Sequence, residues 1–211
     1  MNEKTPDPLV YVVDDEPAIR DSLAMLLRSV GLATRTFDGA QAFLDAFQPA
    51  PNACLLADVR MPGMSGLELQ EALRSRGLKV PVIVLTGHGD IAMAVRAMKA
   101  GAADFIEKPY NDQVLIDAVH RALAASRAPQ GAAPAGADRA AIEARVATLS
   151  PREREVMQLV IEGRPNKVIA TRLGLSTRTV EVHRAKVMEK MQAASLAELV
   201  RMALAAGLPA G

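Results

Sequence analysis

The chain has 211 residues, of which 50% are hydrophobic and only 3% aromatic, so one large domain or two small ones can bury cores packed mainly by aliphatic side chains. No apolar run approaches the ~20 residues of a membrane span, and the first residues lack the basic stretch and apolar core of a signal peptide. We therefore expect a cytoplasmic protein. A single cysteine, Cys54, lies in an apolar run and excludes a disulfide within the chain.

The formal net charge of +1 conceals an uneven distribution. Residues 1–126 hold 12 Lys and Arg against 16 Asp and Glu, whereas residues 127–211 hold 13 against 8. The acidic N-terminal part suits cations. The basic C-terminal part is a weak signal for nucleic acid when it stands alone.

Apolar runs and helical segments alternate through the first 125 residues. Pro near the start and Gly just past the end mark helix boundaries, as at Pro17 and Gly31. The helical segments lie near residues 17–30, 40–47, 65–76, 90–100 and 111–125. Short runs of β-branched and aliphatic residues are typical of buried parallel strands. They are Leu9–Val13, a weaker Ala33–Phe37, Ala53–Ala57, Val80–Leu85 and Ala103–Ile106. This alternation predicts an α/β domain with a doubly wound, five-stranded parallel (βα)5 sheet.

Polar side chains stand where these strands end, and the carboxyl ends of parallel strands open on one crevice. They are Asp14, Asp15, Asp58, Thr86 and Lys108. An acidic turn or a surface lysine alone is usually solvated. Three converging carboxylates, however, repel one another, and Mg²⁺ relieves that repulsion. A carboxylate can also act as a nucleophile and accept a phosphoryl group. A metal ion, a lysine and a hydroxyl would then neutralise the charge of that phosphoryl group.

Four segments in this order and spacing resemble the receiver domain of bacterial two-component response regulators. They are Val13–Glu16, Asp58–Gly66, Leu85–Gly89 and Asp104–Pro109. The resemblance implies that Asp58 is the phosphoacceptor. It implies a Mg²⁺ site formed by Asp14, Asp15, Asp58 and the backbone carbonyl of Arg60. Thr86 and Lys108 would hold the phosphoryl oxygens.

The same resemblance implies roles around the crevice. Phe105 would change rotamer together with Thr86, and Arg60 and His88 would tune the lifetime of the aspartyl phosphate. The helix after Thr86 would form a dimer face through Ile91, Val95 and Lys99, although simple amphipathic packing also explains that pattern.

Strand signals vanish after the receiver-like part. Residues 127–137 contain two Pro and two Gly without periodicity and predict a flexible linker, followed by a possible short helix at Asp138–Ala147. Four helices then follow, near residues 151–162, 166–173, 176–191 and 195–206. Ser150 with Glu153, and Ser195 with Glu198, have the spacing of capping boxes.

The third of these helices has the features of a DNA-recognition helix. Leu173–Ser176 forms a tight turn before it, and Val180, Val187 and Met191 mark its buried stripe. Charge alone also suits a small interaction domain. The candidate DNA contacts are Lys167, Ser176, Thr177, Arg178, Thr179, Glu181, Val182, Arg184, Ala185 and Lys186. Arg178, Glu181 and small apolar groups suit base edges, whereas Lys167, Arg184 and Lys186 suit phosphates.

Three segments resemble the LuxR-type helix-turn-helix, namely Leu149–Val156, Asn166–Ala170 and Ser176–Arg184. Together with the receiver, this is similar to the FixJ/NarL class and favours its FixJ-like members. The resemblance implies a receiver at 1–126, a linker at 127–147 and an all-α, four-helix DNA-binding domain at 148–211. It implies a transcription activator, not an enzyme. Its partners would be a sensor histidine kinase, promoter DNA, RNA polymerase and a second copy of the chain.

Two alternatives remain open from the residues. An aspartate-nucleophile, Mg²⁺-dependent phosphatase or phosphotransferase could use the same crevice, although no substrate-cap segment is evident. A DNA-binding protein that acts independently of phosphorylation would need only the C-terminal helices.

Overall fold

The computed structural model describes residues 7–87, 91–127 and 136–208, and the chain divides into two compact units. The first unit comprises residues 1–88 and 100–129, and the second comprises residues 89–99 and 130–211. Helix α4 (Ile91–Lys99) is thereby grouped with the second unit, although it lies between two strands of the first along the chain.

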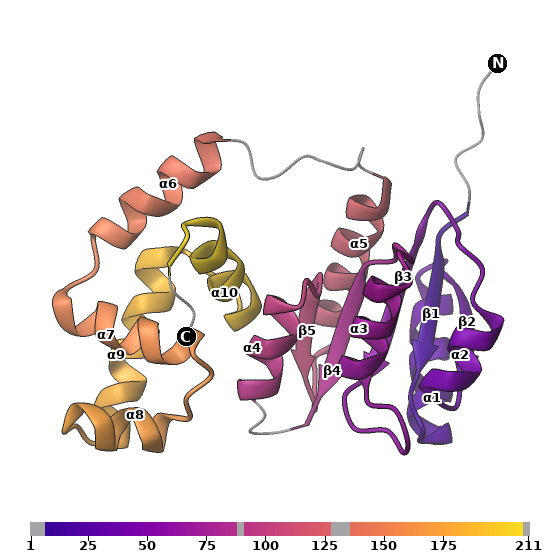
Figure 1. Cartoon of the computed structure of the whole chain (residues 1–211), viewed down its shortest axis with the longest axis horizontal. Coiled ribbons are helices and arrows are strands. Elements are labelled where there is room, and N and C mark those ends of the chain that lie inside the picture. The colour runs from indigo at the N-terminus through magenta and orange to yellow at the C-terminus, as the bar shows by residue number, and fades with distance from the viewer. Residues whose placement is uncertain (1–6, 88–90, 128–135, 209–211) are drawn as a thin grey trace. The chain divides into compact units, whose positions relative to one another are not determined.

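The first unit contains a five-stranded, fully parallel sheet in the order β2-β1-β3-β4-β5 (Figure 1). This confirms the predicted α/β fold. Pro81 lacks an N–H, so the fourth strand begins one residue after it, while its carbonyl still accepts a hydrogen bond from Leu55. The strands are β1 (Leu9–Val13), β2 (Ala33–Phe37), β3 (Ala53–Asp58), β4 (Val82–Thr86) and β5 (Asp104–Glu107).

Helices cover both faces of this sheet. One core packs α1 and α5 against alternate residues of the strands, including Val10, Val12 and Leu56. On the opposite face, Tyr11 of β1 makes an edge-on contact with Phe43 of α2, with ring centroids 5.4 Å apart. Alternation of this kind is expected of strands buried on both faces. The helices are α1 (Pro17–Ser29), α2 (Ala40–Ala46), α3 (Gly66–Ser75) and α5 (Asp112–Arg127).

Cys54 lies within β3 and is fully buried, and burial raises the pKa of its thiol to about 12. A thiol with so high a pKa is a poor nucleophile. Cys54 is therefore a packed side chain of the core.

The second unit is helical in its C-terminal part, as predicted. Its N-caps follow the sequence signals: Ser150 and Glu153 form a complete capping box. The second predicted box is incomplete, because the Glu198 carboxylate accepts from the N–H of Ala194, 2.7 Å away, instead of from the Ser195 N–H. The helices are α6 (Gly136–Ala147), α7 (Pro151–Ile161), α8 (Asn166–Leu173), α9 (Thr177–Met191) and α10 (Leu196–Ala205).

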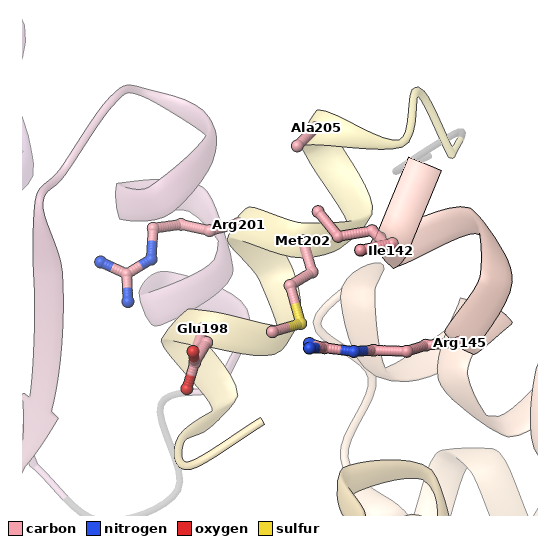
Figure 2. Close-up of a pocket in the computed structure, with 7 residues that line it drawn as sticks. Ile142, Arg145, Glu198, Arg201, Met202 and Ala205 are labelled. Carbon is pink, nitrogen blue, oxygen red and sulfur yellow. The ribbon is translucent and has the colours of Figure 1, made fainter. Parts of the chain in front are cut away.

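Helix α6, predicted as a short connecting helix, packs against the helices that follow it. Ile142 and Val146 are buried, and the Arg145 guanidinium donates to the carbonyl of Met191 at 3.2 Å. Figure 2 shows Ile142 and Arg145 reaching from α6 toward Met202 on α10, where they line a cavity of about 380 Å³. The part of the predicted linker that lies in α6 is thus packed against the C-terminal helices, whereas Arg127, at its start, belongs to α5 (Asp112–Arg127).

Candidate functional site

The phosphoacceptor candidate lies at the switch point of the sheet. The strand order reverses between β1 and β3, and these two neighbouring strands carry Asp14 and Asp58 at their carboxyl ends. Both carboxylates are buried. Gly66 at the start of α3 approaches closely from the side: a Cβ there would lie 2.3 Å from the carbonyl oxygen of Asp58. Only glycine allows α3 to begin this near to Asp58.

Lys108 joins the two buried carboxylates. Its Nζ donates to Asp14 Oδ2 at 2.9 Å and to Asp58 Oδ1 at 2.6 Å. Burial lowers the pKa of the ammonium, but the hydrogen bonds to Asp14 and Asp58 outweigh that effect and raise it. Burial also raises the pKa of Asp58, although Lys108 and the backbone N–H of Arg60 act in the opposite direction. Lys108 is therefore a charged counterion shared by both acids.

The remaining oxygens of these two carboxylates also accept hydrogen bonds. The N–H of Arg60 donates to Asp58 Oδ2 at 2.6 Å, and the N–H of Glu16 donates to Asp14 Oδ1 at 2.9 Å. Asp15, by contrast, is half-buried, and within residues 7–87, 91–127 and 136–208 its carboxylate has no hydrogen bond or ion pair. Of the three carboxylates, that of Asp15 is thus the one available to bind a further cation.

The fit of this donor set to a divalent cation follows from its chemistry. Carboxylates and a backbone carbonyl are the oxygen ligands that Mg²⁺ prefers, with water completing the shell. Among the described residues, no group of three or more His, Cys, Asp or Glu side chains is arranged to hold a metal by itself. A cation here would combine Asp15 with one neighbouring carboxylate, a backbone carbonyl and water.

The other predicted site residues differ in burial and in their hydrogen bonds. Thr86 is buried, and its hydroxyl makes a long, 3.4 Å hydrogen bond to the Gly87 carbonyl and none to Asp58. Lys108 is fixed to the end of β4 because its N–H donates to the Thr86 carbonyl at 2.7 Å. Phe105 is half-buried, and the side chain of Arg60 is exposed.

Part of the predicted set lies outside the described structure. His88 and the side chain of Ile91 are outside the described residues. On α4, Val95 is buried and Lys99 is exposed. The roles predicted for these four residues stay predictions.

One contact in the acidic site had no sequence signal. The Arg20 guanidinium, in the second turn of α1, donates to the backbone carbonyl of Asp14 at 2.7 Å. This hydrogen bond therefore fixes the loop between Asp14 and α1 to the helix that follows it. A lone arginine on a helix is usually solvated, so composition and spacing could not identify it.

The second candidate site is the helix-turn-helix formed by α8 and α9. Gly174 ends α8 with φ +64°, a left-handed conformation that favours glycine, and the Leu175 N–H returns to the Ala170 carbonyl. Ser176 then caps α9: its hydroxyl accepts from the Thr179 N–H at 3.0 Å. The predicted tight turn is present.

Helix α9 separates into a buried and an exposed face. Val180, Val187 and Met191 are buried, which confirms the predicted stripe. Arg184 is half-buried. The Ser176 and Thr179 hydroxyls lie 2.7 Å from each other, within the cap. The exposed candidates on this helix and its neighbour are Lys167, Thr177, Arg178, Glu181, Val182, Ala185 and Lys186.

Comparison with protein families identifies both parts of the chain. Residues 10–120 match the response regulator receiver domain, and residues 147–203 match the bacterial regulatory proteins of the luxR family. The receiver match includes α4. No helix in the described ranges is long and apolar enough to cross a membrane.

Relatives and solved structures match nearly the whole chain. It is 54% identical to the transcriptional regulatory protein FixJ of Azorhizobium caulinodans, over 94% of this chain and 93% of that protein, and 52% identical to FixJ of Rhizobium meliloti, over 95% and 97%. The crystal structure of full-length FixJ from B. japonicum matches with a TM-score of 0.55 and 48% identity, over 97% and 100%. The chain therefore belongs to the FixJ-like transcriptional response regulators, which combine a receiver domain with a LuxR-type DNA-binding domain.

Proposed function

We propose that this chain is a phosphorylation-controlled transcription factor in which Asp58 accepts a phosphoryl group from a sensor histidine kinase. The observation that carries this proposal is the cluster around Lys108. Asp58 has one oxygen on the Lys108 ammonium and the other on the Arg60 N–H, while the carboxylate of Asp15 has no partner among the described residues and is available to a cation. This arrangement has the parts that phosphoryl transfer to a carboxylate requires.

Asp15, Asp58 and the carbonyl of Arg60 would hold Mg²⁺ together with water, and Asp14 would assist from beside them. The ion would neutralise charge on the incoming phosphoryl oxygens. The hydrogen bond to Asp14 holds the Lys108 ammonium in place, and from there the ammonium would bind a phosphoryl oxygen. The hydroxyl of Thr86 makes only a long hydrogen bond to Gly87, so little is lost when it turns toward a phosphoryl oxygen.

The added charge of about −1.5 to −2 would bias the receiver between two arrangements, with Phe105 following Thr86. Phosphorylated receivers would then pair through α4, with Ile91, Val95 and Lys99 at the dimer face, and Arg60 and His88 would set the lifetime of the phosphoryl group. Because the proposed phosphodonor and the DNA are both cytoplasmic in a bacterium, the regulator would act there.

Two paired chains would present two recognition helices to an inverted-repeat site with half-sites about one helical turn apart. Arg178 and other exposed side chains of α9 would contact base edges. Lys167 and Lys186 would contact phosphates. We propose activation as the outcome, through contact with RNA polymerase. Three of the matched relatives carry the name transcriptional regulatory protein FixJ, which supports a role in transcription.

The proposal is tested by incubating the full chain with acetyl phosphate and Mg²⁺ and measuring intact mass. We expect one phosphoryl group per chain, none on Asp58→Asn, and normal labelling of Asp21→Asn, which changes an exposed carboxylate on α1. Turnover of a phosphoester far beyond one equivalent would favour a phosphatase instead. Full labelling of Asp58→Asn would contradict the assignment of the phosphoacceptor.

A further inference from the structure

Helix α8 is held at both ends by arginines from the two helices that flank it in sequence. At its first residue, the Asn166 Oδ1 accepts from Arg184 of α9 at 2.6 Å. At its last residue, the carbonyl of Leu173 accepts from Arg152 of α7. Hydrogen bonds with a charged donor are among the stronger ones in proteins, so each contact can resist movement of the helix end to which it is bonded.

Arg184 differs from the other basic residues that the sequence predicts as DNA contacts. Lys167, Arg178 and Lys186 are exposed, and no hydrogen bond or ion pair of theirs occurs among the described residues. Arg184 is half-buried, and its guanidinium spans from the middle of α9 to the start of α8. A side chain already engaged inside the protein must break that bond before it can bind a phosphate with the same N–H.

The first helix of a helix-turn-helix crosses the DNA backbone while the second enters the major groove. Their relative orientation therefore decides whether phosphate and base contacts form together. The turn at Gly174 joins the C-terminal end of α8 to α9 but leaves the N-terminal end of α8 to be fixed by other contacts. The bond between Arg184 and Asn166 supplies such a contact.

We propose that Arg184 and Arg152 form a guanidinium clamp that orients α8 relative to the recognition helix, and that Arg184 is a positioning residue rather than a ligand of DNA phosphate. The clamp rests on DNA binding by this domain. It replaces the interpretation of Arg184 as a phosphate contact. The hydrogen bond of Arg184 to Asn166, and not a contact of Arg184 with DNA phosphate, is then what DNA binding requires.

The test uses full-length variants and a DNA duplex selected from a random pool by the wild-type chain. Arg184→Gln removes the charge and, because the glutamine side chain is two bonds shorter, also the hydrogen bond to Asn166, whereas Asn166→Ala removes only the acceptor. Lys186→Gln, the same kind of change at an exposed cation two residues along α9, is the matched control. Affinity is measured over a range of salt concentrations, and thermal unfolding verifies that each variant is folded.

We expect Asn166→Ala and Arg184→Gln each to weaken binding by about tenfold and to keep the wild-type salt dependence. Lys186→Gln should lower the slope of log affinity against log salt by about 0.9, the value of one lost phosphate contact. The clamp is wrong if Arg184→Gln lowers the slope as Lys186→Gln does, or if Asn166→Ala binds like the wild type. Failure of the wild-type chain to select any DNA would instead count against the proposed function.

Discussion

The acidic crevice of the receiver and the exposed face of the helix-turn-helix treat their charges in opposite ways. In the crevice, Asp14 and Asp58 are buried and share Lys108, so opposite charges are paired within the protein. On the DNA-binding domain, Lys167, Arg178 and Lys186 are exposed and have no partner in the described structure. In the first site the opposite charges are already paired within the protein. In the second site the positive charges are available to pair with a polyanion.

This difference teaches how each site should respond to change. A buried pair that loses one member leaves an uncompensated charge, which affects the fold itself. An exposed cation that is removed changes affinity and salt dependence but leaves the fold intact. Substitutions in the two regions should therefore separate stability from binding.

The largest expected effect is that of Lys108→Ala. Two buried carboxylates lose their shared counterion, so the free energy of unfolding should fall by about 3 kcal/mol at neutral pH. Urea unfolding measures this, and added Mg²⁺ should restore part of the loss by replacing the cation. Arg96→Ala, at an exposed position on α4 with no partner among the described residues, is the control. Equal stability of Lys108→Ala and the wild type would show that the pair contributes little.

Arg178→Ala should act on DNA alone. Loss of one base-reading side chain is expected to weaken specific binding by about 1–3 kcal/mol and to relax the preference at a single base position. Binding measured across single-base variants of a selected site provides the comparison. The unfolding temperature should stay at the wild-type value, because Arg178 is exposed and has no partner within the described residues. A lower unfolding temperature would instead show that Arg178 contributes to the stability of the fold.

Asp15→Asn should weaken Mg²⁺ binding by about tenfold or more, because it removes the crevice carboxylate that has no partner in the described part of the chain. Calorimetric titration with Mg²⁺ in the absence of any phosphodonor measures the affinity directly. Asp21→Asn should bind Mg²⁺ as the wild type does. An unchanged affinity of Asp15→Asn would show that Asp15 is not a ligand.

The smallest expected effect concerns an ion pair inside the DNA-binding domain. Glu153 accepts from Lys190 at 2.6 Å and from the Ser150 N–H at 2.8 Å, and these contacts hold its pKa at about 2, below the usual 4.5. Because the pKa is lowered on folding, this stabilisation is present above pH 4.5 and is lost as the pH falls toward 2.

Glu153→Gln should therefore cost about 1 kcal/mol near neutral pH, since Lys190 is partly exposed and its charge is screened. Urea unfolding at several pH values should show the wild type and the variant converging in acid. Parallel curves with a constant gap would assign the loss to the cap geometry and not to the charge.

Sequence patterns predicted the layout of both regions but few of their contacts. The strand ends located Asp14, Asp58 and Lys108, because apolar runs followed by polar residues identify the carboxyl edge of a parallel sheet. That Lys108 would bridge both acids could not be predicted, since its position depends on the pairing of β1, β3, β4 and β5, which lie far apart in sequence.

Local signals were the most reliable, and tertiary contacts the least. The caps at Ser150 and Ser176 depend on residues three positions away, and both are present. The bond between Arg184 and Asn166 and that between Arg20 and the Asp14 carbonyl join groups that no periodicity relates. Basic residues on one helix look alike in sequence, and only packing separates Arg184 from Lys186.

The central claim is that the charge state of Asp58 controls the DNA-binding domain. The most direct test is the affinity of the full chain for a selected DNA duplex before and after treatment with acetyl phosphate and Mg²⁺, for the wild type and Asp58→Asn. We predict tighter binding by the phosphorylated wild type and no response from Asp58→Asn. Equal affinity of the phosphorylated and unphosphorylated wild type would contradict the claim.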